Sequence, residues 1–219
     1  MSRVLVVNPN TTATVSELLA RRIGAAIGSA AEVEAITASF GAAYIASEAS
    51  YVVAAHAALA ACSAWCDANG RPDAIIVGCF GDPGVLALRE ALALPVLGLA
   101  EAAMREAATH GRFAIVTGGA AWGPMLTRLA RALDLADRLA AIEIVTATGA
   151  ELAADPERAV SLLGDACMRA ARSADAVVLG GAALAGMGEP IAASLRMKVP
   201  IIDSVDAAAR AASATLGGA

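Results

Sequence analysis

Cys79 is the residue whose type and position best suit acid–base chemistry. It follows the apolar run Ala74–Val77 and precedes Asp82-Pro83-Gly84. Pro83 is typical of a first helical turn, so we expect a helix to begin near these residues. The unsatisfied N–H groups and partial positive charge of a helix N-terminus lower the pKa of a nearby thiol from about 8.5 and favour a reactive thiolate. The alternative is a buried, inert cysteine, because free cysteine is among the most buried residue types.

The remaining cysteines give no signal for a metal site. Cys62 and Cys66 share one face of an alanine-rich helical stretch, but no second pair of Cys or His residues at suitable spacing completes a zinc site. Cys167 lies in another helical stretch. We therefore predict that these three pack in the core and that no metal binds. An even count of four cysteines does not imply disulfides in a chain without a secretory signal.

Four segments rich in Gly, Asn or Thr follow expected strands, where a ligand could bind. They are Asn8–Thr12, Cys79–Gly84, Thr117–Gly119 and Gly180–Gly186. Their backbone N–H groups could bind a small carboxylate or a ring carbonyl. Neither the dinucleotide pattern G-x-G-x-x-G nor a Walker phosphate loop is present, so we predict no nicotinamide, flavin or other cofactor.

The elements that must position these segments follow from the hydrophobic pattern. Short β-branched runs alternate with long alanine-rich stretches that favour helices. The expected strands cover residues 3–7, 32–37, 74–79, 95–99, 112–117, 142–147, 175–180 and 199–202. Parallel neighbours need crossover connections, which the intervening helices provide. The sequence therefore predicts an α/β fold with mainly parallel sheets.

An internal repeat indicates that this fold is duplicated. Residues 3–8, 73–79 and 94–102 resemble residues 112–117, 175–181 and 199–207, in the same order. We expect two pseudo-symmetric Rossmann-like lobes. The first covers residues 1–98 and is completed by a C-terminal helix at about 203–219, and the second covers residues 99–202. Because ligands bind beyond the carboxyl ends of parallel strands, equivalent strand ends should face one another across a cleft.

Composition excludes several classes of protein. With 58% hydrophobic and 17% charged residues, the 219-residue chain is not intrinsically disordered. A net charge of −5, no basic cluster and 3% aromatic residues argue against nucleic-acid binding. No apolar run reaches the roughly 20 residues of a membrane span and no secretory signal is present, so we expect a cytoplasmic protein without a membrane partner. The apolar excess over the needs of one small core predicts a homo-oligomer.

Five segments in order form a set that is more specific than any one of them. They are Asn8-Pro-Asn-Thr-Thr, Gly78-Cys-Phe-Gly-Asp-Pro-Gly, Pro95-Val-Leu-Gly-Leu-Ala-Glu-Ala-Ala, Phe113-Ala-Ile-Val-Thr and Pro200-Ile-Ile-Asp. Together they resemble the aspartate/glutamate/hydantoin racemase superfamily, nearest its hydantoin and allantoin racemase branch. The resemblance spans nearly the whole chain. It implies two lobes around a cleft and cofactor-independent proton transfer at a carbon next to a carbonyl, in a hydantoin, allantoin or Asp/Glu-like substrate.

The resemblance also implies site residues. In such racemases one cysteine from each lobe flanks the substrate carbon, and Cys79 matches the cysteine of the first lobe. The segment Tyr44–Ser47 lines the pocket or leads into a helix with Ser47 as its cap. The expected substrate-binding residues are Asn8, Asn10, Ser47, Phe80, Gly81, Thr117, Gly118 and Ala182.

The sequence departs from the family pattern where the second cysteine should stand, because Gly181 occupies that position. Inversion needs an acid or base on each face of the carbon, and glycine cannot transfer a proton. Three interpretations follow. The favoured one is a racemase whose second acid/base comes from elsewhere, for example Glu189 or an ordered water. The second is a single-cysteine decarboxylase or lyase that resembles arylmalonate decarboxylase, and the third is a non-catalytic protein that binds a small carboxylate.

Overall fold

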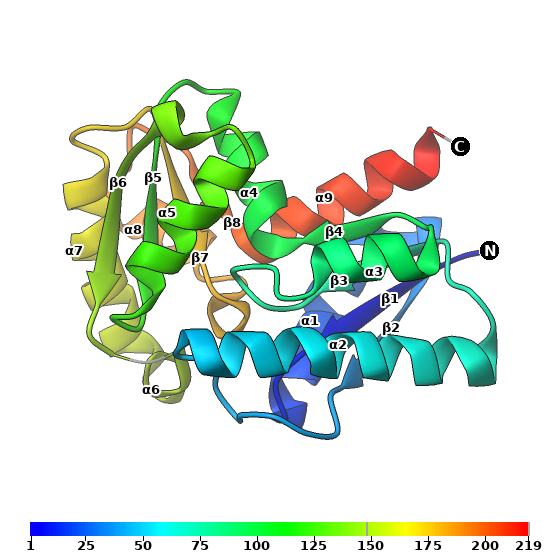
Figure 1. The fold of residues 1–219 in the computed structure, drawn as a ribbon. Helices are drawn as coiled ribbons and strands as arrows, with labels where there is room; N and C mark the ends of the chain where they lie inside the picture. Colours follow the sequence, from blue (N-terminus) through cyan, green and yellow to red (C-terminus); the bar gives the residue numbers. More distant parts are fainter. Residues whose placement is uncertain (148, 219) are drawn as a thin grey trace.

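Two parallel four-stranded sheets form the frame of the molecule, as the computed structural model shows for residues 1–147 and 149–218 (Figure 1). The first sheet contains β1 (Ser2–Asn8), β2 (Ala31–Thr37), β3 (Ala74–Val77) and β4 (Val96–Gly98), in the order β2-β1-β3-β4. The second contains β5 (Phe113–Gly118), β6 (Leu139–Val145), β7 (Ala176–Gly180) and β8 (Ile201–Asp203), in the order β6-β5-β7-β8. Because the same strand order occurs twice, the predicted two-lobed α/β fold is confirmed.

Helices connect the strands and cover the sheets. They are α1 (Ala13–Ile27), α2 (Glu48–Asn69), α3 (Val85–Leu92), α4 (Leu99–Ala108), α5 (Trp122–Ala132), α6 (Gly149–Ala154), α7 (Pro156–Ala170), α8 (Gly188–Leu195) and α9 (Ser204–Gly217). Short 3-10 turns are η1 (Gly28–Ala30), η2 (Ala136–Arg138) and η3 (Ala182–Leu184). The crossovers expected from the alanine-rich stretches are therefore present in both lobes.

The largest apolar cluster joins the two lobes. It combines buried residues of α1, α4 and α9, such as Leu19, Met104 and Val205, with Ile76 of the first sheet and Ile115 of the second. Smaller clusters lie beneath α2 and α3 in the first lobe and beneath α7 and α8 in the second. Burial of apolar surface is the main driving force for such packing, so the strand ends of the two lobes are held in a fixed relation.

Helix α9 is central to this shared core, since it packs against both α1 and α4 (Figure 1). At its start Asp206 accepts two hydrogen bonds of 2.7 Å from the Arg22 guanidinium of α1. Further along, Arg210 pairs with Glu106 of α4. The proposed lobe limits at residues 98 and 202 stay a prediction, because α4 and α9 both lie in the core that the lobes share.

Helix α2 is, among the described residues, long and apolar enough to span a membrane by length and composition alone, with a mean hydropathy of 1.4. Its buried residues, which include Ala58, Cys62 and Trp65, pack against the first sheet. This test is weak evidence, because a core helix of a globular protein also passes it. The absence of a membrane partner stays a prediction.

Candidate active site

A cavity of about 370 Å³ lies where the carboxyl ends of β3, β5 and β7 converge. Seven residues singled out from the sequence line it: Asn10, Cys79, Phe80, Thr117, Gly118, Gly181 and Ala182. Strands β5 and β7 pair in register so that Thr117 lies opposite Gly180, which brings the turns after both strands to one wall. Such strand ends are where ligands bind in open α/β sheets. The cavity is therefore the candidate active site.

Three other expected residues do not line this cavity. Asn8 is buried beneath the turn that follows β1, where its amide group donates to Asn10 Oδ1, the Thr12 carbonyl and Ser16 Oγ at 3.0 Å each. Ser47 is the N-cap of α2 and forms a capping box with Ser50. The structure thus places Asn8 and Ser47 where they shape neighbouring segments.

Gly81, the third of these residues, is a point of contact between the lobes. Its φ of +129° lies in a region that favours glycine. A Cβ atom at this position would lie 2.4 Å from the Trp122 ring, so only glycine allows the close approach of that indole. The carbonyl of Gly81 accepts a hydrogen bond of 2.9 Å from the Tyr51 hydroxyl. Gly81 therefore lets the turn after Cys79 contact α5 of the second lobe.

The expected lowering of the Cys79 pKa is wrong. Helix α3 begins at Val85, six residues after Cys79, and its N-cap Gly84 has a left-handed backbone conformation. The thiol is not adjacent to the first turn of that helix. Burial raises the pKa of Cys79, and the nearby Asp82 carboxylate raises it further. Cys79 is therefore a neutral thiol at neutral pH, which suits it to donate a proton and gives its thiolate a high proton affinity.

Asp82 fixes the turn that contains Cys79. Its backbone N–H donates to the Cys79 carbonyl at 3.1 Å. Its carboxylate accepts hydrogen bonds from the N–H groups of Ala100 (2.8 Å) and Glu101 (2.7 Å) in the first turn of α4. A Cβ atom at Gly98 would lie 2.1 Å from the Asp82 carboxyl carbon, so glycine is required there. The carboxylate thus ties the cysteine turn to the shared core.

Asp82 should make stability depend on pH. Burial raises its pKa to about 7, whereas an unfolded aspartate has a pKa of about 3.9. As pH rises, the carboxyl group of Asp82 therefore loses its proton in the unfolded state before it does so in the folded state. The contribution of Asp82 to stability is complete below about pH 4 and is lost progressively between about pH 4 and pH 7. We expect the free energy of unfolding, measured by urea denaturation, to fall by up to about 2 kcal/mol from pH 5 to pH 7 relative to an Asp82→Asn variant. An equal pH slope in both proteins would contradict this assignment.

Gly181 differs from Cys79 in backbone conformation as well as in side chain. Its φ is +145°, where an L-residue is strained, and its N–H donates to Ser204 Oγ at 3.3 Å. A Cβ atom there would approach Leu184 to 3.2 Å. The turn after β7 is therefore shaped around glycine, so a cysteine at this position would be strained.

Several cavity residues were not assigned from the sequence. Trp122 at the start of α5 and Leu184 of η3 add apolar walls. The segment Tyr44–Ser47, for which the sequence left two interpretations open, does both: Tyr44 and Ile45 line the cavity and Ser47 caps α2. Trp122 could have been suspected from the sequence. It is one of two tryptophans in the chain, and it closely follows the Gly118-Gly119 pair at an expected strand end. For Leu184 the sequence offers no signal that separates it from core leucines. Among residues 1–147 and 149–218, no group of three or more His, Cys, Asp or Glu residues could hold a metal ion.

Comparison with known proteins identifies the family. The sequence matches the Asp/Glu/Hydantoin racemase family over residues 4–212. The chain belongs to this family. Hydantoin racemase from Paenarthrobacter aurescens is 30% identical over 213 residues, which cover 96% of this chain and 89% of the relative. The resemblance inferred from the five sequence segments is thereby confirmed.

Solved structures show where the same fold occurs. Allantoin racemase from Pseudomonas fluorescens has a TM-score of 0.92 and 29% identity, and the match covers 98% of this chain and 91% of that one. Arylmalonate decarboxylase has a TM-score of 0.66 and 18% identity, with 99% and 93% covered. The second similarity is one of fold alone.

Proposed function

We propose that this protein is a cofactor-independent racemase that acts on a hydantoin-like ring, with Cys79 as the acid/base on one face of the substrate. The supporting observation is that Cys79 is the one thiol among the described residues that line the cavity. The Cys79 thiolate would remove the proton from the ring carbon next to a carbonyl. The electron pair of that C–H bond would move onto the carbonyl oxygen as an enolate, and a proton added to the other face would give the opposite enantiomer.

The cavity lining favours a neutral substrate. Among the described residues around the cavity there is no Lys, Arg, His, Asp or Glu. A bound carboxylate would lose its hydration without gaining a countercharge, which costs several kcal/mol. A hydantoin ring carries only neutral C=O and N–H groups, and Asn10 and Thr117 offer donors and acceptors of the same kind. Phe80 and Trp122 give apolar walls for a ring substituent.

We therefore expect 5-substituted hydantoins or allantoin to react at least about 10²-fold faster than aspartate, glutamate or an arylmalonate. Burying an unpaired charge costs several kcal/mol, and each 1.36 kcal/mol lowers a rate about tenfold. Proton NMR in deuterated water, with chirality read in parallel, measures this with single-enantiomer substrates. Deuterium incorporation with loss of optical purity supports the racemase. Faster turnover of the dicarboxylates would contradict a neutral substrate.

A single-cysteine lyase is the second candidate, because Gly181 offers no side chain to a second face. Its signature is release of carbon dioxide with formation of one enantiomer. The charge-free lining argues against it, because a malonate substrate carries two carboxylates. The third interpretation, binding of a small carboxylate without turnover, predicts no reaction with any substrate of the panel and meets the same objection.

A further inference from the structure

Racemisation requires a proton donor on the face of the carbon that Cys79 does not reach. Gly181 provides none, and its backbone is shaped around glycine. Glu189, considered from the sequence, is exposed in α8 and is not among the residues of the cavity wall. Among the described residues that line the cavity, the side chains with an ionisable S–H or phenolic O–H group are those of Cys79 and Tyr44.

The Tyr44 hydroxyl lies against the second lobe. Tyr44 belongs to the connection between β2 and α2 of the first lobe, yet its hydroxyl is 3.4 Å from the Gly118 carbonyl oxygen at the end of β5. A Cβ atom on Gly119 would lie 3.2 Å from the same hydroxyl. Thr117 of β5 pairs with Gly180 of β7, so Gly118 and Gly181 follow the last paired residues of two neighbouring strands. The hydroxyl thus lies at the end of the strand that neighbours β7, after which a second-lobe cysteine would stand.

Cys79 reaches the same cavity from the first lobe. It follows β3, which pairs with β1 in the first sheet. Both residues belong to the first lobe, but the Tyr44 hydroxyl lies against the end of β5 in the second lobe, whereas Cys79 follows β3 of the first sheet. From this arrangement we infer that Tyr44 is the second acid/base of the proposed racemase and replaces the cysteine that is absent at Gly181. This inference rests on the proposed function.

The proton transfers balance as follows. The Cys79 thiol first loses its proton to solvent, and the thiolate then takes the proton from carbon and becomes a thiol again as the enolate forms. The Tyr44 O–H bond breaks as its proton adds to the opposite face of that carbon, which leaves a tyrosinate. The tyrosinate then takes a proton from solvent, which restores the neutral Cys79 thiol and the Tyr44 hydroxyl of the resting protein. In the reverse direction the tyrosinate removes the proton and the thiol supplies one.

A further observation suits Tyr44 to this role. The segment that presents it is fixed to the turn after β1, because Thr11 N donates to the Ala42 carbonyl (3.2 Å) and Thr12 Oγ1 to the Ala43 carbonyl (2.8 Å).

The test is a Tyr44→Phe variant in deuterated water with each enantiomer of a 5-substituted hydantoin. We expect racemisation to fall by about 10²-fold or more. Cys79 should still exchange the proton of the one enantiomer whose C–H bond faces it, with retained configuration, and the other enantiomer should not react. Tyr51→Phe removes a hydroxyl that bonds to Gly81 and should keep the wild-type ratio of racemisation to exchange.

The outcomes separate the two proposals. Racemisation by Tyr44→Phe at the wild-type rate would overturn the role of Tyr44 and leave the proposed function intact. Loss of exchange of both enantiomers in a variant with a wild-type melting temperature would also overturn it, because Tyr44 would then serve both steps equally. If the wild-type protein neither exchanges nor racemises any hydantoin, the proposed function fails, and the inference fails with it.

Discussion

Replacing Cys79 with serine is expected to reduce deuterium exchange into the substrate by about 10³- to 10⁴-fold. A serine hydroxyl is close to the thiol in shape, but it holds its proton much more tightly and is a poor base for a C–H bond. Cys79 is buried beside Ile76 and Phe80 in the shared core. The substitution therefore changes proton transfer much more than packing. Initial rates of exchange, measured by NMR on both enantiomers, give the size of the effect.

Cys66→Ser is the matched control for this experiment. Cys66 is half-buried on α2 beneath the first sheet, outside the cavity lining. We expect its rate of exchange to equal that of the wild type. Full turnover by Cys79→Ser would contradict every mechanism in which this thiol moves the proton, including the single-cysteine lyase.

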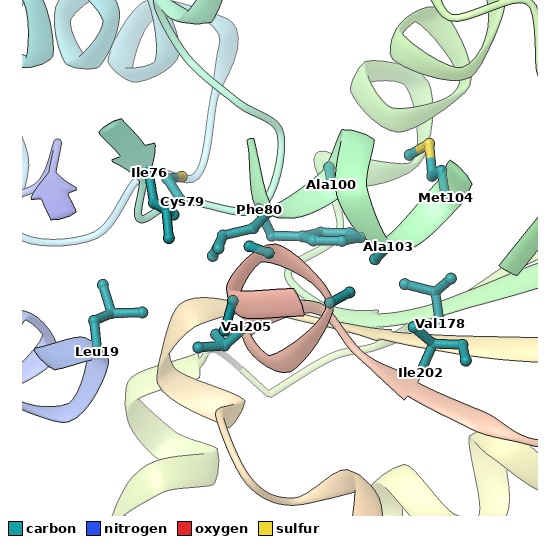
Figure 2. Close-up of a cluster of buried hydrophobic side chains, with 14 of the residues drawn as sticks. Leu19, Ile76, Cys79, Phe80, Ala100, Ala103, Met104, Val178, Ile202 and Val205 are labelled. Carbon is teal, nitrogen blue, oxygen red and sulfur yellow. The ribbon is translucent and has the colours of Figure 1, made fainter. Parts of the chain in front are cut away.

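Truncating Phe80 to alanine should lower the free energy of unfolding by about 3–5 kcal/mol, the usual cost of deleting a buried aromatic ring. The ring extends from the Cys79 turn toward Ala103 of α4, with Ala100 and Val205 nearby (Figure 2). Its edge lies so close to Gly180 that a Cβ atom there would be 2.2 Å from it. Phe80 therefore joins the end of β7 to the core that both lobes share, and its loss leaves a cavity there.

Urea denaturation monitored by circular dichroism measures this change. Leu86→Ala is the control, because the Leu86 side chain is 77% exposed on α3, and its loss should alter stability by no more than about 0.5 kcal/mol. If Phe80→Ala were as stable as Leu86→Ala, the ring would contribute nothing to the junction of the lobes.

The fold could be predicted from the sequence because its signals are local. Runs such as Ala74–Val77 and Ala176–Gly180 are rich in β-branched residues and are bounded by glycine at their carboxyl ends. Signals of this kind placed all eight expected strands correctly, with ends that differ by a few residues. The start of α3 could not be placed, since Pro83 suggested an earlier first turn. The left-handed backbone of Asp82 and Gly84 delays that helix until Val85. The predicted pKa of Cys79 failed for this reason, and because its burial depends on the whole core.

The candidate site was predicted only in part, for a similar reason. Residues that follow strands directly, such as Thr117 and Gly181, were found because strand ends face the cavity. Trp122, at the start of α5, was not assigned, because its position depends on contacts between lobes such as that with Gly81. For Tyr44 the sequence left a pocket wall and a helix lead-in open, because the path of the β2–α2 connection is not fixed by local pattern. Asn8 has the type expected of a ligand-binding residue, but local hydrogen bonds with Asn10 and the turn use its amide group.

The packing of α9 on α1 has a consequence for synthesis on the ribosome. Leu19 and Ile23 of α1 belong to the cluster that α9 helps to bury, and the ion pair between Arg22 and Asp206 joins residues 184 positions apart. An apolar face of α1 must therefore stay uncovered, or be covered by a chaperone, until the chain has been translated beyond α9. Nascent chains that stop before residue 203 should expose this face and aggregate, although they already contain every strand of the first sheet.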